Sequence, residues 1–177
     1  MANEKKTDLD LAYCTYVLNG EPISRLVCDG ISYEAFSGDS ASYVNDVRFQ
    51  DVVKKGPLPL GKYYILDRES GGLMGVAGQS LNDFFAGTNR STWLSLYRDD
   101  GVIDDQTIIN NTQRGAFRIH PVGPRGISEG CVTLTSGIGF EELRRNIRNR
   151  SGAIIPGRDI RYYGILEVIE EKVITTQ

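Results

Sequence analysis

The chain has 177 residues, enough for a single domain that buries a core without metals or several disulfides to hold it together. Lysine and arginine number 20 against 23 aspartates and glutamates, and this net charge of −3 argues against a nucleic-acid-binding protein. The 40% hydrophobic and 24% charged content is that of a folded globular domain. One histidine and three scattered cysteines argue against a zinc site, so we expect no metal and no other cofactor.

The first ten residues are polar, and we expect a short N-terminal segment (1–11) followed by one domain (12–177). No apolar stretch follows Met1 that would form a signal peptide, and there is no twin-arginine pattern. No apolar run reaches the length of about 18 residues that a transmembrane helix needs. The sequence therefore predicts synthesis in the cytoplasm without membrane insertion.

Short segments rich in β-branched and aromatic residues, several of them alternating, predict strands along most of the chain. In chain order they are 13–18, 23–28, 31–36, 62–66, 92–97, 116–120, 131–135 and 162–169. Residues 37–45 and the acidic segment 98–105 are expected to be loops. The prolines of Gly56-Pro-Leu-Pro-Leu-Gly61 predict a rigid connection between strands.

Two helices are predicted. Ser80-Leu-Asn-Asp83 has the pattern of a helix start, and a short helix from there would end at Gly87. Within 139–150, Phe140, Leu143 and Ile147 share one face, as in an amphipathic helix. Many strands with about two short helices indicate a mainly β fold, a sandwich or barrel around one core.

The cysteines near the N-terminus lie on the first two predicted strands. Asn19-Gly20 between those strands is a strong hairpin signal. A two-residue turn at Gly20–Glu21 would set Cys14 opposite Val27, one step out of register with Cys28. Disulfide geometry is demanding, so we expect free thiols unless a bulge aligns them.

The segment from Arg118 to Cys131 concentrates the candidate chemistry. A predicted strand ends at His120, a loop rich in proline and glycine follows, and Cys131 begins the next strand. A histidine can activate a cysteine nucleophile, and the small Gly130 gives access to the backbone N–H groups that an oxyanion hole needs. A buried structural cysteine is the usual fate of a free thiol, so spacing alone leaves both interpretations open.

His120 followed by Ser128-Glu-Gly-Cys-Val132 resembles the signature of the L,D-transpeptidase catalytic domain. Gly56-Pro-Leu-Pro-Leu-Gly-Lys-Tyr63 resembles an upstream element of that fold. With Ala35-Phe-Ser-Gly38 and Phe117-Arg-Ile-His-Pro121, the chain is most similar to the L,D-transpeptidase-like antibacterial effectors of type VI secretion. The resemblance covers about residues 23–170, and it departs from many cell-wall enzymes at Glu129 (a histidine there), at Thr133 (an arginine there) and in its shorter loop.

The resemblance implies a peptidoglycan enzyme that acts on tetrapeptide stems as an L,D-carboxypeptidase, an L,D-transpeptidase or both. Cys131 would attack the carbonyl of the third stem residue, and His120 would move the proton. Ser128 would shape the turn or orient His120, and Gly130 would help to hold the oxyanion. Arg118, Arg125, Glu129 and Tyr97 are candidates for substrate contact. A solvated or structural charge is an equal alternative for each arginine, and Glu129 is better suited as a local hydrogen-bond partner than as a general acid. Tyr97 and Trp93 could line the groove, but a strand-core position is the favoured prediction for both.

Two rival functions remain at this stage. A papain-like hydrolase places its cysteine before its histidine, the reverse of the order here, and a binding module on the same fold would have an inert Cys131. The resemblance further implies delivery by type VI secretion components into the periplasm of a target cell. A cognate immunity protein in the periplasm of the producing bacterium would be a further partner.

Overall fold

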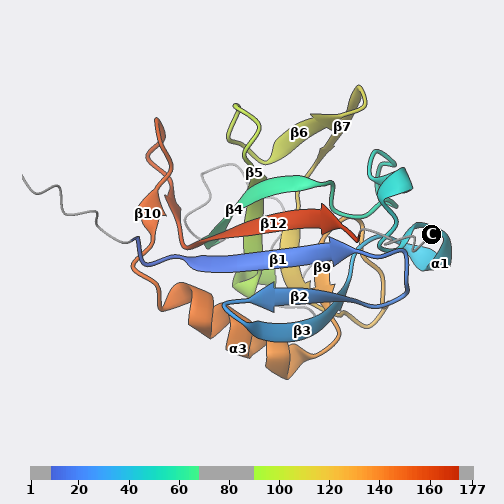
Figure 1. The fold of residues 1–177 in the computed structure, drawn as a ribbon, viewed down its shortest axis with the longest axis horizontal. Helices are drawn as coiled ribbons and strands as arrows, with labels where there is room; N and C mark the ends of the chain where they lie inside the picture. The colour runs from blue at the N-terminus through green and yellow to red at the C-terminus, as the bar shows by residue number, and fades with distance from the viewer. Residues whose placement is uncertain (1–8, 68–89, 172–177) are drawn as a thin grey trace, which may run out of the picture.

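The structure is a computed structural model and describes residues 9–67 and 90–171. Eight strands form a closed barrel in the order β1-β12-β4-β5-β8-β9-β3-β2 (Figure 1). Their bounds in chain order are β1 Ala12–Leu18, β2 Ser24–Cys28, β3 Ile31–Phe36, β4 Gly61–Asp67, β5 Leu94–Arg98, β8 Arg118–Pro121, β9 Val132–Leu134 and β12 Gly164–Glu170. The mainly β architecture predicted from the sequence is confirmed.

Two pairs of barrel strands run parallel, β1 with β12 and β8 with β9. The other neighbours in the barrel are antiparallel. A parallel pair cannot be joined by a tight turn, because the chain must return to the end where the first strand began. The proline- and glycine-rich segment after His120 makes this return between β8 and β9.

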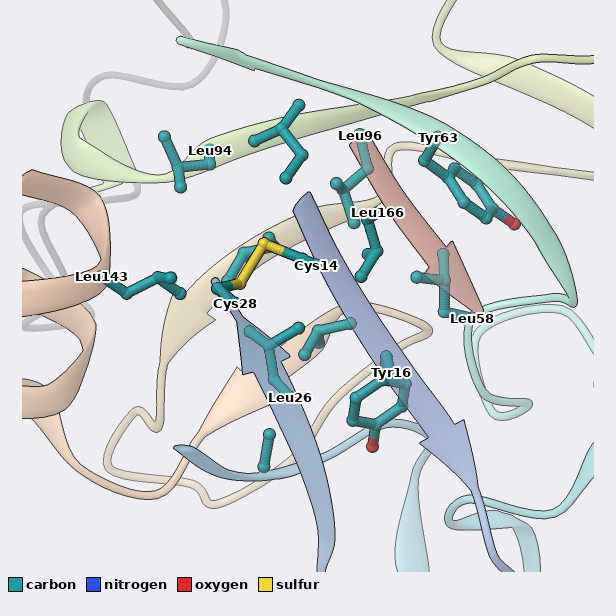
Figure 2. Close-up of a cluster of buried hydrophobic side chains, with 14 of the residues drawn as sticks. Cys14, Tyr16, Leu26, Cys28, Leu58, Tyr63, Leu94, Leu96, Leu143 and Leu166 are labelled. Atoms are coloured by element: carbon teal, nitrogen blue, oxygen red, sulfur yellow. A yellow bond between two sulfur atoms is a disulfide. The ribbon is translucent and has the colours of Figure 1, made fainter. Parts of the chain in front are cut away.

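The barrel interior is filled by side chains that alternate with outward-facing ones along each strand. In β1 the residues alternate between buried and less buried positions over its whole length. Tyr16, Leu26, Leu96 and Leu166 come from four different strands and are each at most 1% exposed. Figure 2 shows these side chains converging on the barrel centre.

The helix α3 (Gly137–Arg148) packs against the barrel with the apolar face predicted from its sequence. Ser136 accepts a hydrogen bond from the amide of Gly139 at 3.0 Å, and this N-cap starts the helix two residues earlier than expected. Phe140, Leu143 and Ile147 are buried, and Figure 2 shows Leu143 pointing into the core. Across the two described stretches, no helix has the length and apolar character needed to cross a membrane.

Sequence reasoning missed two hairpins outside the barrel, β6 (Gln106–Ile109) with β7 (Thr112–Gly115) and β10 (Ala153–Ile154) with β11 (Arg161–Tyr162). The β6–β7 turn uses Asn110 and Asn111 at positive φ, a conformation that asparagine tolerates well. In Figure 1 this hairpin stands out from the barrel on the side away from α3. The predicted loop 37–45 contains a single helical turn, α1 (Ser40–Tyr43). The helix predicted at 80–87 lies outside the described residues.

The expectation of free thiols at Cys14 and Cys28 is wrong. These residues are direct partners in the β1–β2 register and form a disulfide. The connection spans 19–23, longer than a two-residue turn, because the Asn19 side chain accepts from the amide of Glu21 and donates to the carbonyl of Ile23. The wider turn moves the register by one residue and brings the two cysteines together.

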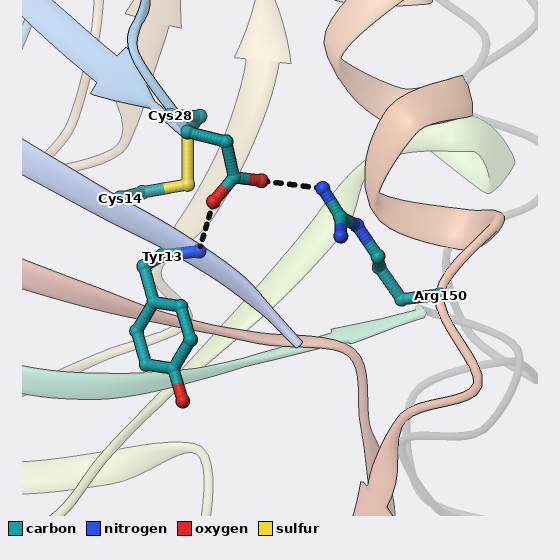
Figure 3. Close-up of a disulfide and its surroundings, with 5 residues drawn as sticks. Tyr13, Cys14, Cys28 and Arg150 are labelled. Atoms are coloured by element: carbon teal, nitrogen blue, oxygen red, sulfur yellow. Dashed lines mark hydrogen bonds and ion pairs between the residues drawn. A yellow bond between two sulfur atoms is a disulfide. The ribbon is translucent and has the colours of Figure 1, made fainter. Parts of the chain in front are cut away.

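The disulfide lies in the core, with Cys14 4% and Cys28 5% exposed. Beside it, the Asp29 carboxylate accepts from the amide of Tyr13 at 3.0 Å and from Arg150 at 2.7 Å (Figure 3). These contacts tie the β1–β2 hairpin to the segment that follows α3. The crosslink therefore joins β1 and β2 close to the segment that follows α3.

Replacing both cysteines (Cys14→Ala with Cys28→Ala) is expected to lower the free energy of unfolding by about 3 kcal/mol, because the crosslink closes a loop of 14 residues in the unfolded chain. Urea unfolding followed by circular dichroism measures the change. As a control, a reducing agent should weaken the wild type and leave the double variant unchanged. Equal stability of the two oxidised proteins would contradict the crosslink.

Candidate active site

The parallel register of β8 and β9 builds the site. Ile119 lies opposite Val132 and both face the core, while His120 lies opposite Thr133 on the other face. Side chains two residues apart on a strand share a face, so Cys131 is placed on the same side as His120. Both side chains line one pocket of about 450 Å³.

The turn before Cys131 is held by its own side chains. Ser128 is 2% exposed, and its hydroxyl donates to the carbonyl of Cys131 at 2.8 Å. This bond closes the turn, so among the described contacts Ser128 shapes the turn and does not bond to His120. Gly130 has φ +107°, a conformation that suits glycine and sets the backbone direction into Cys131.

The hydrogen bonds of His120 fix the state of its ring. Nδ1 lies 2.8 Å from the carbonyl oxygen of Pro121, which can only accept, so Nδ1 carries the proton. Nε2 then has the free lone pair and lies 3.3 Å from the hydroxyl of Thr133, which donates to it. Burial and the charge of Arg90 lower the pKa of His120, while the Pro121 bond opposes them. A lowered pKa favours the neutral ring at pH 7, and in that form Nε2 is the basic nitrogen.

Trp93 holds the flat face of the His120 ring. The two rings are stacked with centroids 4.2 Å apart and planes within 18°. On the indole the guanidinium carbon of Arg90 lies 5.4 Å from the ring centroid. Trp93 is thus a pocket-lining residue, the alternative that sequence reasoning ranked below a core position.

The Cys131 side chain is half-buried and is the free cysteine of the chain. Its sulfur lies 3.9 Å from the carbonyl oxygen of Ala116, the acceptor of its weak hydrogen bond in the described structure. Burial raises the pKa of Cys131 to about 11, against the amide and guanidinium of Arg118, which lower it. The resting pair is a neutral thiol and a neutral imidazole, and such contacts often tighten only when substrate binds.

The pocket brings together three of the four residues predicted to contact substrate, Arg118, Arg125 and Glu129. Arg125 and Glu129 are exposed, whereas the Arg118 side chain is 16% exposed and is occupied by an ion pair with Asp105. Tyr97 does not line this pocket. It is 8% exposed and packs in a second apolar cluster, the core position that was its alternative.

Sequence reasoning missed Arg114, an arginine of β7 that is only 4% exposed. Its guanidinium donates to the carbonyls of Gln50, Gly56 (3.0 Å) and Pro57 (3.3 Å). A Cβ atom on Gly130 would come within 2.5 Å of it, so the guanidinium packs directly on the turn before Cys131. Arginine in a short polar strand gives no sequence signal of burial, and only the fold reveals this support.

The pocket is cationic although the chain is acidic. Its charged lining residues are Glu129 and the cations Lys54, Arg90, Arg114, Arg118 and Arg125. Within the described residues, no group of three or more His, Cys, Asp or Glu is arranged to hold a metal. The arrangement offers a thiol, a neutral base and a positive environment, which suits acyl transfer from a substrate that carries carboxylates.

His120 is the only histidine in the chain and Trp93 is the only tryptophan. Because their rings are stacked, the fluorescence of Trp93 reports the charge of His120. Protonated imidazole stacked on indole quenches its emission, so fluorescence should fall on acidification through one transition below the ordinary pKa of 6.5. A His120→Gln variant should lack the transition. A midpoint at or above 6.5 would contradict the buried, neutral ring.

Comparison with known proteins bears on the same segments. No curated protein and no solved structure matches the chain. A family model described as the Tlde1 domain matches residues 31–158, which include β3, the pocket and the whole of α3. The family comprises L,D-transpeptidase-like effectors of type VI secretion, with a role in modifying peptidoglycan. The match spans well over half of the chain, so this protein belongs to the Tlde1-domain family.

Proposed function

We propose that the protein is a cysteine enzyme that removes or exchanges the terminal D-residue of peptidoglycan tetrapeptide stems. The observation that carries the proposal is the shared pocket of Cys131 and His120 on one face of β8 and β9, in a chain of this family. The thiol supplies a nucleophile, and the ring presents a neutral nitrogen to take its proton.

In the proposed reaction, the Cys131 sulfur attacks the carbonyl carbon of the third stem residue while Nε2 of His120 accepts the thiol proton. A C–S bond forms and the C–N bond to the terminal D-residue breaks, with His120 returning the proton to the leaving amine. Water then releases a tripeptide, or an amine forms a new peptide bond. Backbone N–H groups at Gly130 and Cys131 would stabilise the oxyanion.

The charge of the pocket supports this substrate. Stem peptides carry free carboxylates, and the exposed Lys54 and Arg125 are placed where such groups would meet positive charge. The buried Arg114 adds a cation with carbonyl oxygens as its hydrogen-bond partners. A peptide substrate with several carboxylates therefore complements the pocket better than a neutral or basic peptide.

The disulfide supports action outside the cytoplasm. Disulfides persist in oxidising compartments such as the bacterial periplasm and are rare in the cytoplasm. The Cys14–Cys28 crosslink would thus form after delivery by the type VI machinery into the target periplasm, where the substrate lies. A periplasmic immunity protein that covers the Cys131 pocket would protect the producing cell.

Purified protein is expected to release D-alanine from a disaccharide tetrapeptide and leave a tripeptide, as seen by mass spectrometry. Cys131→Ala should abolish the release without lowering the melting temperature, and His120→Gln should slow it roughly 100-fold or more. Continued trimming by Cys131→Ala would refute the proposed nucleophile. Cleavage of another bond would favour a different hydrolase, and sacculus binding without cleavage would favour a binding module.

Expression in bacteria separates the two compartments. With an added signal peptide the protein should arrest growth or lyse the cells, and without one it should be tolerated, because the stems lie in the periplasm. The Cys131→Ala variant with the same signal peptide is the matched control and should be harmless. Toxicity that appears only without the signal peptide would contradict the proposed site of action.

A further inference from the structure

A charged pair beside the pocket has no part in the proposed reaction so far. The guanidinium of Arg118 donates to both carboxylate oxygens of Asp105 at 2.6 Å each, and to the carbonyl of Phe117 at 2.6 Å. The pair joins β8 to the segment before the β6–β7 hairpin. Arg118 is thereby held in one orientation at the pocket wall.

Asp105 also holds the backbone next to Arg118. Its carbonyl accepts from the amide of Ala116 at 2.9 Å, and a Cβ atom at Gly115 would lie 2.3 Å from that same oxygen. Ala116 has φ +57°, a left-handed conformation that is uncommon for a residue other than glycine. Asp105 therefore fixes residues 115–118 through both its main chain and its side chain.

The nucleophile rests against this fixed segment. The Cys131 sulfur faces the carbonyl of Ala116 at 3.9 Å, and the amide of Arg118 lies close enough to favour the thiolate. The positive charge of Arg118 also lowers the pKa of Cys131, whereas the negative charges of Glu129 and Asp105 raise it. Both members of the ion pair thus act on the sulfur, with opposite signs.

We propose that the Asp105–Arg118 pair is a positioning device for Cys131, which holds residues 116–118 against the sulfur and balances the charge that the sulfur meets. The inference rests on the proposed role of Cys131 as the nucleophile. Arg118 is then a positioning residue more than a clamp for substrate carboxylates, because Asp105 already occupies its two terminal nitrogens. Asp105 takes a role that neither its sequence position nor the pocket lining indicates.

The two substitutions have opposite expected effects on thiol reactivity. Arg118→Gln removes the charge that favours the thiolate, so alkylation of Cys131 by iodoacetamide at about pH 8 should slow by about tenfold, the effect of one pKa unit. Asp105→Asn removes the opposing charge and keeps the side-chain shape, so alkylation should quicken by about threefold. The disulfide occupies the other cysteines, so the rate reports Cys131 alone.

Matched controls separate the effect of the ion pair on Cys131 from the effect of a change in the net charge of the protein. Asp104→Asn changes the neighbouring exposed acid and Arg25→Gln removes an exposed arginine of β2, and both should alkylate within twofold of wild type. Slower alkylation of Asp105→Asn, like that of Arg118→Gln, would mean that Asp105 holds the segment without opposing the thiolate, and this would overturn the proposed charge balance at the sulfur. An unchanged rate in Asp105→Asn would do the same.

If Arg118→Gln shows no cooperative thermal transition, the sign of the Asp105→Asn effect decides the question alone. The assay needs no substrate, so its failure would leave the proposed activity standing. Failure of the stem-peptide assay with a normal alkylation pattern would instead reject the proposed function. The two ideas are therefore tested separately.

Discussion

The parallel pairing of β8 with β9 is the constraint on which the rest of the site depends. It sets His120 beside Thr133 and leaves Cys131 one step before β9, on the face that also carries Arg118. The buried partners Ile119 and Val132 hold this register from the core side, where both are 0% exposed. A slip by one residue would turn the pocket side chains into the core, so packing of the barrel and placement of the chemistry are one requirement.

Much of the fold follows from local pattern. The barrel strands and α3 were predictable because alternation and the Phe140, Leu143 and Ile147 spacing reflect burial directly. The β6–β7 hairpin was missed, since it lies outside the barrel and has no sustained apolar face. The disulfide was missed because a side-chain hydrogen bond of Asn19 widens the turn, a local contact that propensity does not describe.

In the site, sequence pattern singled out Cys131 and His120, and the fold places them in one pocket. It did not indicate what surrounds them. Thr133 was noted only as a departure from the family, yet its hydroxyl bonds to the basic nitrogen of His120. Arg114 packs against Gly130, 16 positions later in the chain, and Asp105 bonds to Ala116 and Arg118, 11 and 13 positions later. Such contacts depend on the three-dimensional path of the barrel.

Cys131 and His120 are both uncharged in the resting state. A half-buried thiol with a raised pKa and a buried imidazole with a lowered pKa both favour their neutral forms. Activation would then come from the approach of substrate, which displaces water and brings the sulfur and Nε2 into contact. This contrasts with a preformed thiolate–imidazolium pair and would keep the free thiol unreactive before it meets its target.

The central claim is that Cys131 becomes covalently acylated. The most direct measurement is the intact mass of the protein after it is mixed with disaccharide tetrapeptide and quenched in acid at short times, followed by mapping of the modified peptide. We predict an adduct equal to the substrate less D-alanine, located on Cys131. Release of D-alanine with Cys131 unmodified at every time, or an adduct on another residue, would contradict the account.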